Sequence, residues 1–326
     1  MAKGIILDHT GGPDVLVMRD ITLPAVGPGQ ARLRHTAIGL NFIDVYHRSG
    51  LYPVPLPGSI GSEAAGIVEE IGEGVDFLKV GQRVAYAGGP PGAYVEQRVM
   101  AADRLIPLPD FLSDEQAASV LLQGMTVQYL LRRTFPVQKG QTILFHAAAG
   151  GVGLIACQWA KAMGVTLIGT VSSEAKAQLA KDHGAAHVID YSKEDFVAKV
   201  KEITAAKGVP VVYDGVGKDT FMKSLDCLQP RGMMVSFGNS SGAVPDFPPG
   251  VLAGKGSLYL TRPTLAHYTA TRQELLETAN DLFDQIKSGA VKTNIGQTYD
   301  LADAAKAHQD LEARRTTGST VFHVKH

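Results

Sequence analysis

The stretch TILFHAAAGGVGLIACQWAKAMG, residues 142–164, decides the fold. Its apolar start, Thr142–Phe145, predicts a strand, and a turn rich in alanine and glycine follows directly. Beyond the turn, apolar residues recur at three- and four-residue spacing, which predicts a helix; they are Val152, Ile155, Ala156, Trp159, Ala160 and Met163. The order strand, glycine turn, helix predicts the opening unit of an α/β domain with a parallel sheet.

The turn itself fits the pattern G-x-G-x-x-G at Ala148, Gly150 and Gly153, with alanine in place of the first glycine. Gly150 permits close approach of the backbone to a pyrophosphate, and Gly153 permits tight packing of helix on strand. The N–H groups at the helix start, around Gly151 and Val152, favour a bound phosphate. A glycine turn without a ligand is the alternative, but this turn opens a longer series of strands and helices. The residues therefore predict a dinucleotide-binding site.

Strand and helix patterns alternate over residues 125–265. Six apolar runs predict strands: TILFHAA, VTLIGTV, HVIDY, PVVYDGV, GMMVSFGN and SLYLT. Their alternation with helical patterns predicts a doubly wound, six-stranded parallel sheet covered on both faces. Residues 1–124 instead show short β-like runs separated by glycine and proline, which predicts a loop-rich β domain. Residues 266–326 contain a long amphipathic helix and a closing strand, and we expect them to fold back onto residues 1–124.

Composition and charge indicate the cellular setting. The 326 residues are 45% hydrophobic, and 31 basic residues nearly balance 32 acidic ones. A near-neutral chain without a basic run does not indicate a nucleic-acid or membrane-surface partner. The N-terminal segment lacks an apolar leader and no 18-residue apolar run occurs, so we expect a cytoplasmic protein. Cys157 and Cys227 show no C-x-x-C spacing and are expected to be buried apolar residues.

The end of the second strand, VTLIGTV, indicates which cofactor is bound. NAD enzymes usually carry Asp or Glu there for the ribose 2′-hydroxyl. Here Ser172 and Ser173 end the strand, and Lys176 lies just beyond. Hydroxyls and a cation suit the 2′-phosphate of NADPH, which a carboxylate would repel. Glu174 is acidic, and we expect it to point away from the phosphate as a first-turn residue favoured by the helix dipole.

Several motifs together resemble those of one known family. They are GLNFIDVYHRSGLYP (residues 39–53), GSEAAGIVEEIGEGV, GQRVAY, AAAGGVG, VIDYSKEDF and FGNSSG. On these motifs, which span essentially the whole chain, the sequence is identified as a member of the medium-chain dehydrogenase/reductase superfamily, in its zinc-free quinone oxidoreductase branch, which includes zeta-crystallin. The resemblance implies a GroES-like catalytic domain (1–124) completed by the tail (266–326), a Rossmann domain for NADPH (125–265), and an active site in the cleft between them.

The resemblance also indicates where the metal ligands of zinc-dependent relatives would stand. A cysteine and a histidine of those relatives correspond to Asn41 and Ser62 here. Amide and hydroxyl oxygens are poor zinc ligands beside thiolate and imidazole. The segment between Val84 and Tyr94, AYAGGPPGA, also lacks the cysteines of the structural zinc lobe. We therefore expect neither a catalytic nor a structural zinc ion.

Without a Lewis acid, the expected acceptor is one that takes hydride or electrons unaided. Quinones delocalise the incoming charge and conjugated enals and enones form an enolate, so quinone reduction is predicted and enal or enone reduction is the alternative. The resemblance implies that Asn41, Tyr46 and Tyr52 line the substrate site, where a phenol could donate to a developing oxyanion. Both tyrosines could instead be packing residues. Arg262 is a further substrate-side candidate, and a non-catalytic NADPH-binding or RNA-binding role is a second alternative.

The resemblance brings further residues to the cofactor. It implies that Tyr191 and Arg314 reach the 2′-phosphate, with the adjacent Arg315 an open alternative to Arg314. It also assigns Thr126 and Phe237 to the cofactor site.

The last predicted strand of the parallel sheet, Ser257–Thr261, is expected to lie at its edge. An apolar edge strand invites pairing with a copy of itself, and the resemblance points to a homodimer built this way. His146, which follows the first strand, is expected to be a buried structural histidine rather than a catalytic one.

Overall fold

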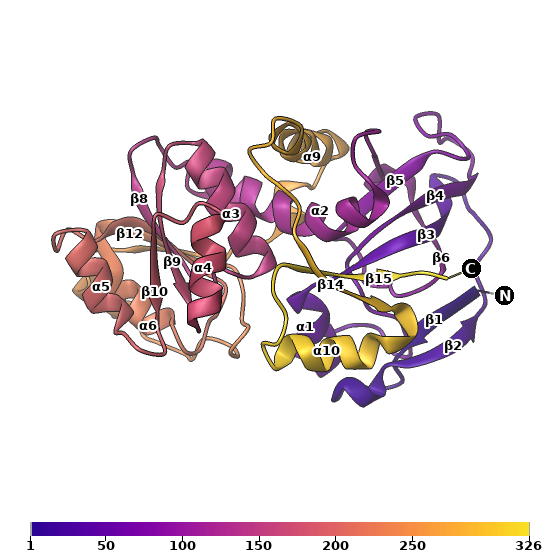
Figure 1. The fold of residues 1–326 in the computed structure, drawn as a ribbon. Coiled ribbons are helices and arrows are strands. Elements are labelled where there is room, and N and C mark those ends of the chain that lie inside the picture. The colour runs from indigo at the N-terminus through magenta and orange to yellow at the C-terminus, as the bar shows by residue number, and fades with distance from the viewer. Residues whose placement is uncertain (1, 326) are drawn as a thin grey trace. The chain divides into compact units, whose positions relative to one another are not determined.

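A computed structural model describes residues 2–325, which form two compact units (Figure 1). The first unit comprises residues 2–125, 269–287 and 293–325 of the described chain, and the second comprises residues 126–268 and 288–292. Each unit contains a cluster of buried apolar side chains.

A six-stranded parallel sheet forms the centre of the second unit. Its strands are β8 (Thr142–Phe145), β9 (Thr166–Val171), β10 (His187–Asp190), β11 (Val209–Asp214), β12 (Leu228–Ser236) and β13 (Tyr259–Thr261). They lie in the order β10-β9-β8-β11-β12-β13, and every neighbouring pair is parallel. The chain builds outward from β8 in one direction and from β11 in the other, so a topological switch point lies between these strands. The doubly wound sheet predicted from the sequence is confirmed.

Helices flank this sheet (Figure 1). They are α3 (Gly151–Ala162), α4 (Glu174–Asp182), α5 (Phe196–Ile203), α6 (Phe221–Ser224), α7 (Gly250–Gly254) and α8 (Leu265–Tyr268), with single turns at η3 (Leu130–Thr134) and η4 (Leu225–Cys227). α3 packs on β9, α4 and α5 on β10, and α6 on β11 and β12. Ile155 and Trp159 of α3 are buried, as the periodicity of the opening stretch predicts.

The edge strand β13 is shorter than predicted. It begins at Tyr259 and not at Ser257, because Ser257 adopts a left-handed backbone conformation (φ 56°) and the N–H of Leu258 donates to the carbonyl of Leu252. Among the described strands, β13 pairs only with β12, and its Tyr259 and Leu260 are 59% and 39% exposed. The strand is therefore the sheet edge that the sequence predicts, over fewer residues.

The first unit is mainly β-structure. Its larger sheet has the order β14-β15-β3-β4-β5-β7, with β6 also paired to β3. The strands are β3 (Gln30–Leu40), β4 (Glu63–Ile71), β5 (Arg83–Ala87), β6 (Gln97–Ala101), β7 (Ile106–Pro107), β14 (Ile295–Asp300) and β15 (Ser319–His323). β1 (Ala2–Ile6) and β2 (Val17–Ile21) form a separate antiparallel pair. Alternate residues of β3 are buried, so one face of this strand covers the core.

The C-terminal tail contributes two strands to this sheet. β15 pairs antiparallel with β3, and β14 pairs parallel with β15. β14 was not predicted, because its sequence IGQTYD has too few apolar residues to show an alternating pattern. The helices of this unit are α1 (Phe42–Ser49), α9 (Arg272–Lys287) and α10 (Ala304–Glu312), with turns η1 (Pro13–Val15), η2 (Ala102–Arg104) and η5 (Leu301–Asp303). The boundary between the two units falls inside α2 (Asp114–Tyr129).

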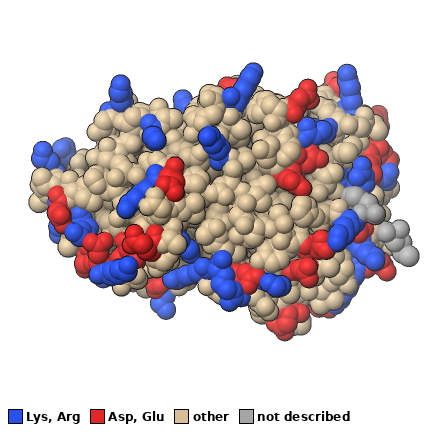
Figure 2. Space-filling view, viewed as in Figure 1, with Lys and Arg blue, Asp and Glu red and all other residues tan. Residues whose placement is uncertain are grey.

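Charges of both signs are mixed on the surface. On the face drawn in Figure 2, described Lys and Arg side chains alternate with Asp and Glu. Within residues 2–325, no helix has the length and apolar character needed to cross a membrane.

Candidate functional site

The glycine turn after β8 has the geometry of a phosphate-binding turn. Gly150 precedes the first residue of α3, so the N–H groups of Gly151 and Val152 lie at the positive end of the helix. A Cβ on Gly153 would lie 2.3 Å from the carbonyl oxygen of Ala147, so only glycine fits there. Ala148 replaces the first glycine of the pattern and is buried against β9, where a Cβ on Gly169 would lie 2.5 Å from its methyl group.

Ser172 and Ser173 follow β9, as predicted. Ser173 is the N-cap of α4, and its Oγ accepts a long hydrogen bond (3.4 Å) from the backbone N–H of Lys176. Tyr191 follows β10, and its backbone N–H donates to the carbonyl of Val171, which brings it beside the end of β9. The carboxyl ends of β9 and β10 thus place two hydroxyls, a lysine and a phenol on one edge of the sheet.

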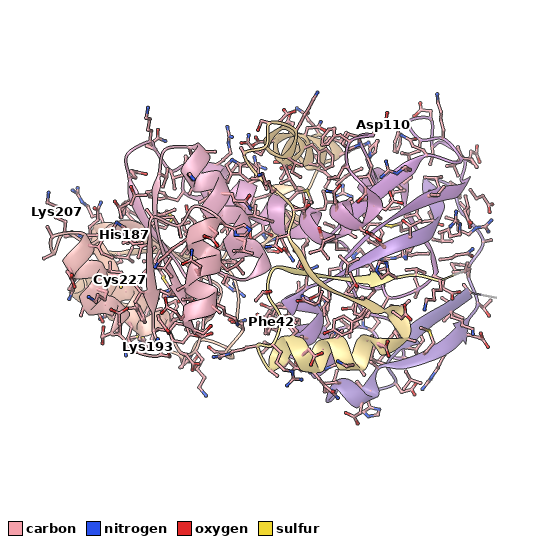
Figure 3. All side chains as sticks on the ribbon, in the orientation of Figure 1. Phe42, Asp110, His187, Lys193, Lys207 and Cys227 are labelled. Carbon is pink, nitrogen blue, oxygen red and sulfur yellow. The ribbon has the colours of Figure 1, made fainter. Side chains whose placement is uncertain are left out.

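Two acidic side chains also lie on this edge and share one cation. Glu174 is the first residue of α4, and its carboxylate lies 3.7 Å from Nζ of Lys193 (labelled in Figure 3). Asp190 ends β10, and its Oδ2 lies 3.8 Å from the same Nζ. A hydrogen bond from the Ser192 hydroxyl lowers the pKa of Asp190. Asp190 and Lys193 were not among the predicted site residues, although both stand in the motif VIDYSKEDF.

Two further predicted residues lie at the carboxyl end of β12. The N–H of Phe237 donates to the carbonyl of Asp214, and its ring packs 5.6 Å from that of Phe145. Arg262 follows β13, and its Nη1 donates to the carbonyl of Ser236 at 2.8 Å. Thr126 lies in α2, in the second unit.

Asn41 lies in the first unit as the N-cap of α1, whose first residue, Phe42, is labelled in Figure 3. The side chain Nδ2 of Asn41 donates to Glu63 Oε2 at 2.7 Å, and its Oδ1 accepts from Gln123 at 3.3 Å. Ser319 of β15 in turn donates to Gln123 Oε1 at 2.8 Å. Asn41 is only 8% exposed, so its amide belongs to a chain of buried hydrogen bonds.

Tyr46 and Tyr52 lie side by side. Their ring centroids are 5.2 Å apart in an edge-on arrangement, and the N–H of Tyr52 donates to the carbonyl of Tyr46. The Tyr46 side chain is buried, whereas Tyr52 is partly exposed. Asn41 and the two tyrosines thus come from α1 and the turn that follows it.

Ser62, for which the sequence resemblance implies the position of a metal ligand in zinc-dependent relatives, binds a carboxylate here. Its hydroxyl donates to Asp44 Oδ1 at 3.0 Å. Asp44 Oδ2 accepts from the backbone N–H of Asn41 at 2.9 Å and from the Tyr94 hydroxyl at 3.1 Å. Burial raises the pKa of Asp44 to about 7 and that of Glu63 to about 8. The side chains of Asn41 and Ser62 therefore both bind buried carboxyl groups.

Comparison with known proteins places the chain in a family. Residues 27–110 match the family described as alcohol dehydrogenase GroES-like domain, and residues 151–284 match zinc-binding dehydrogenase. The quinone oxidoreductase of Pseudomonas aeruginosa is 58% identical over 99% of both chains. The crystal structure of Escherichia coli quinone oxidoreductase complexed with NADPH superposes with a TM-score of 0.97 at 52% identity, over 99% of this chain and 100% of that one. The 2-haloacrylate reductase of a Burkholderia species is 46% identical over 99% of both chains.

The chain belongs to the zinc-free quinone oxidoreductase branch of the medium-chain dehydrogenase/reductase superfamily. The family that the sequence motifs indicated is thus confirmed. Within the described residues 2–325 of this chain, no group of three or more His, Cys, Asp or Glu side chains could hold a metal ion.

The two arginines after α10 differ in their surroundings. Arg315 Nε donates to Asp310 Oδ1 at 2.8 Å, and Asp310 also accepts from Tyr299 and Lys306. These hydrogen bonds lower the pKa of Asp310, and the one from Lys306 contributes most. Arg314 adopts a left-handed backbone conformation (φ 59°) directly after the helix.

Sequence reasoning missed the polar residues around Asn41. Asp44, Glu63, Gln123 and His308 were not among the predicted site residues. Their partners lie up to 260 residues away in the chain, as in the pair of Arg48 with His308. Only the motif residues Asp44 and Glu63 carried a signal, because acidic side chains within otherwise apolar runs are seldom buried without a partner.

Proposed function

We propose that this protein is an NADPH-dependent quinone reductase that works without a metal ion. The observation that carries the proposal is similarity over the full chain to quinone oxidoreductases, one of them solved with NADPH. The reaction would convert a quinone, NADPH and a proton into a hydroquinone and NADP⁺.

The second unit fits NADPH on its own geometry. Gly153 has no room for a side chain, and the start of α3 offers N–H groups to a pyrophosphate. Ser172, Ser173, Lys176 and Tyr191 are proposed to hold the 2′-phosphate, and Thr126, Phe237 and Arg314 to complete the site. NADPH supplies the hydride when bound.

Asn41, Tyr46 and Tyr52 are proposed to act on the acceptor. An amide N–H and two phenols are donors suited to an oxygen that gains negative charge. Arg262 is proposed as a further substrate-side residue. The first unit would be the catalytic domain, completed by residues 269–287 and 293–325 of the tail predicted as 266–326, and the second unit would be the cofactor domain predicted as 125–265.

A specific observation favours a second candidate activity, the reduction of activated carbon–carbon double bonds. The 2-haloacrylate reductase relative is 46% identical to this chain. Steady-state NADPH oxidation with a quinone series and with α,β-unsaturated acids, aldehydes and ketones separates the two. A kcat/KM for every quinone far below that for an unsaturated substrate would replace the first proposal by the second.

The assembly is proposed to be a cytoplasmic homodimer paired through β13. The exposed Tyr259 and Leu260 on a sheet edge support this arrangement. Light scattering should give twice the 34.6 kDa chain mass, and Leu260→Asp should shift the protein to monomers. A wild-type monomer at micromolar concentration contradicts the idea.

A further inference from the structure

A buried chain of hydrogen bonds lies at the switch point of the parallel sheet. His146 follows β8, and its Nδ1 lies 2.8 Å from the Thr170 hydroxyl of β9, while its Nε2 lies 2.9 Å from the Ser224 hydroxyl of α6. Ser224 donates to Asp214 Oδ2 at 3.0 Å. Asp214, which ends β11, and Ser224 are fully buried, and so is His146 apart from 1% of its surface.

The chain has one consistent direction. The Ser224 hydroxyl donates to the Asp214 carboxylate and also lies 2.9 Å from the Thr220 carbonyl; both are acceptors, so the Ser224 oxygen accepts from His146 Nε2–H. Nδ1 of the neutral imidazole is then an acceptor, so the Thr170 hydroxyl donates to it. Burial also lowers the pKa of His146, which favours the neutral ring. Every member is satisfied, and the chain ends on one carboxylate.

That carboxylate shapes the turn after β11. Asp214 Oδ1 accepts from the backbone N–H groups of Val216 and Gly217 at 2.8 and 3.0 Å. The Thr220 hydroxyl donates to Oδ2 at 2.7 Å. The Asp214 side chain thus holds the turn 214–217, and Ser224 and His146 in turn orient the Asp214 side chain.

A second loop, FGNSSG (residues 237–242), rests on this turn. Phe237 N–H donates to the Asp214 carbonyl, Ser240 N–H to the Gly215 carbonyl and Ser241 N–H to the Val216 carbonyl. A Cβ on Gly215 would lie 3.0 Å from the Phe237 ring. The loop after β12 therefore takes its position from the turn after β11.

The location of these two loops indicates what they serve. The predicted 2′-phosphate residues lie at the end of β9, and the glycine turn follows β8. In a doubly wound sheet, a dinucleotide crosses the switch point at the carboxyl ends of the strands. The other half of the cofactor, which carries the nicotinamide, then lies over the ends of β11 and β12.

We propose that His146 and Ser224 are positioning residues that set the two loops, 214–217 and 237–242, against the nicotinamide half of the cofactor. This inference rests on the proposed function. Neither side chain touches the reacting atoms; each acts through Asp214. Loss of either should misplace the nicotinamide and leave the 2′-phosphate end unchanged.

The test compares His146→Leu, which removes both ring nitrogens, with His146→Gln, which keeps a donor toward Ser224. Cys227→Ala is the matched control, because Cys227 (labelled in Figure 3) is fully buried in the same unit and bonds only the Lys223 carbonyl among the described residues. His146→Leu should lower kcat about tenfold or more, since small misplacements of reacting atoms have large effects on rate. The NADPH dissociation constant should change by less than about threefold.

The primary isotope effect with NADPH deuterated at the transferred position should rise in His146→Leu, because hydride transfer becomes slower than the other steps. His146→Gln should recover most of kcat, and Cys227→Ala should lower Tm without changing kcat. Wild-type kcat and isotope effect in His146→Leu would overturn the proposal, as would an equal loss in Cys227→Ala. If His146→Leu does not fold, Ser224→Ala is judged by the same criteria.

The inference can fail independently of the proposed function. The fluorescence lifetime of the reduced nicotinamide in bound NADPH reports on its environment without any acceptor. If no quinone is reduced, the proposed function fails, but a changed lifetime in His146→Leu and Ser224→Ala would still support the positioning role. An unchanged lifetime in both variants would contradict it.

Discussion

Replacing Glu63 by Gln should remove much of the pH dependence of stability. Glu63 is fully buried on β4 and accepts from the Leu122 N–H and the Asn41 amide, each at 2.7 Å. Glutamine has the same shape but does not ionise. Its amide would donate to Asn41 Oδ1, so the amides of Asn41 and Gln123 would turn over and donate in sequence toward Ser319. The variant should therefore keep a fully satisfied core.

The magnitude follows from the raised pKa of Glu63. Burial raises it from 4.5 to about 8, with a smaller contribution from the neighbouring charge of Asp44. Between those values the folded protein binds one more proton than the unfolded chain, so the stabilisation is full below pH 4.5 and is lost as the pH rises through about 8. One group of this kind lowers the free energy of unfolding by about 1.4 kcal/mol per pH unit within the window, and by about 2 kcal/mol between pH 6 and pH 8. Asp44, with a pKa of about 7, adds about 1 kcal/mol over the same range.

Urea unfolding followed by far-ultraviolet circular dichroism at pH 6, 7 and 8 measures these slopes. The difference between wild type and Glu63→Gln isolates Glu63, because histidines and other groups contribute equally to both. Asp44→Asn is the companion variant, and in it the contribution of Glu63 to the pH dependence of the unfolding free energy should remain. Identical slopes in wild type and Glu63→Gln, with equal m-values, would refute the claim that the buried Glu63 carboxyl is protonated in the folded protein.

Three further predictions concern the proposed site. Tyr52→Phe removes a hydrogen-bond donor without emptying its space, so transition-state stabilisation should fall by about 1 to 3 kcal/mol, measured as a lower kcat, while NADPH affinity stays unchanged; wild-type turnover on all quinones and enals would make Tyr52 a packing residue. Lys176→Ala should weaken NADPH binding about tenfold or more in fluorescence titrations and leave NADH binding unchanged, because only NADPH carries the 2′-phosphate; equal weakening of both would contradict this role. Activity should persist in strong chelator with no stoichiometric zinc by elemental analysis, and activity that is lost on chelation and restored by zinc would disprove metal-free catalysis.

Local patterns were sufficient to predict the second unit. The spacing of apolar residues in 142–164 gave β8, the turn and α3, since each depends on residues within one or two turns of chain. The repeated alternation of strand and helix then predicted the parallel sheet and its switch point. The start of β13 was misplaced because the left-handed conformation of Ser257 has no local signature in a serine. β14 was missed because pairing with β15, and not its own composition, makes it a strand.

The surroundings of Asn41 could not be predicted in the same way, because their energetics depend on partners distant in sequence. A carboxylate as buried as that of Asp44 is costly unless donors and a positive charge compensate it. Asp44 is connected to Arg48 through two side chains: Arg48 Nη1 lies 3.3 Å from His308 Nδ1, and His308 Nε2 lies 3.1 Å from the Tyr94 hydroxyl.

The order of donors in this chain is fixed at its charged end. Because the guanidinium can only donate, His308 Nδ1 accepts, Nε2 carries the proton, and the Tyr94 hydroxyl is left to donate to Asp44. Burial and the nearby Arg48 charge lower the pKa of His308 to about 3, so the ring stays neutral throughout the physiological range, and this order of donors applies while Asp44 is ionised. In this family member, a directed chain of donors from Arg48 thus orients Asp44 and, through Asp44, both Ser62 and the start of α1. The Ser62 side chain is thus bound to Asp44, whose donors lead back to Arg48, four residues beyond Asp44 in sequence, and that relation becomes apparent only once α10 brings His308 beside Tyr94.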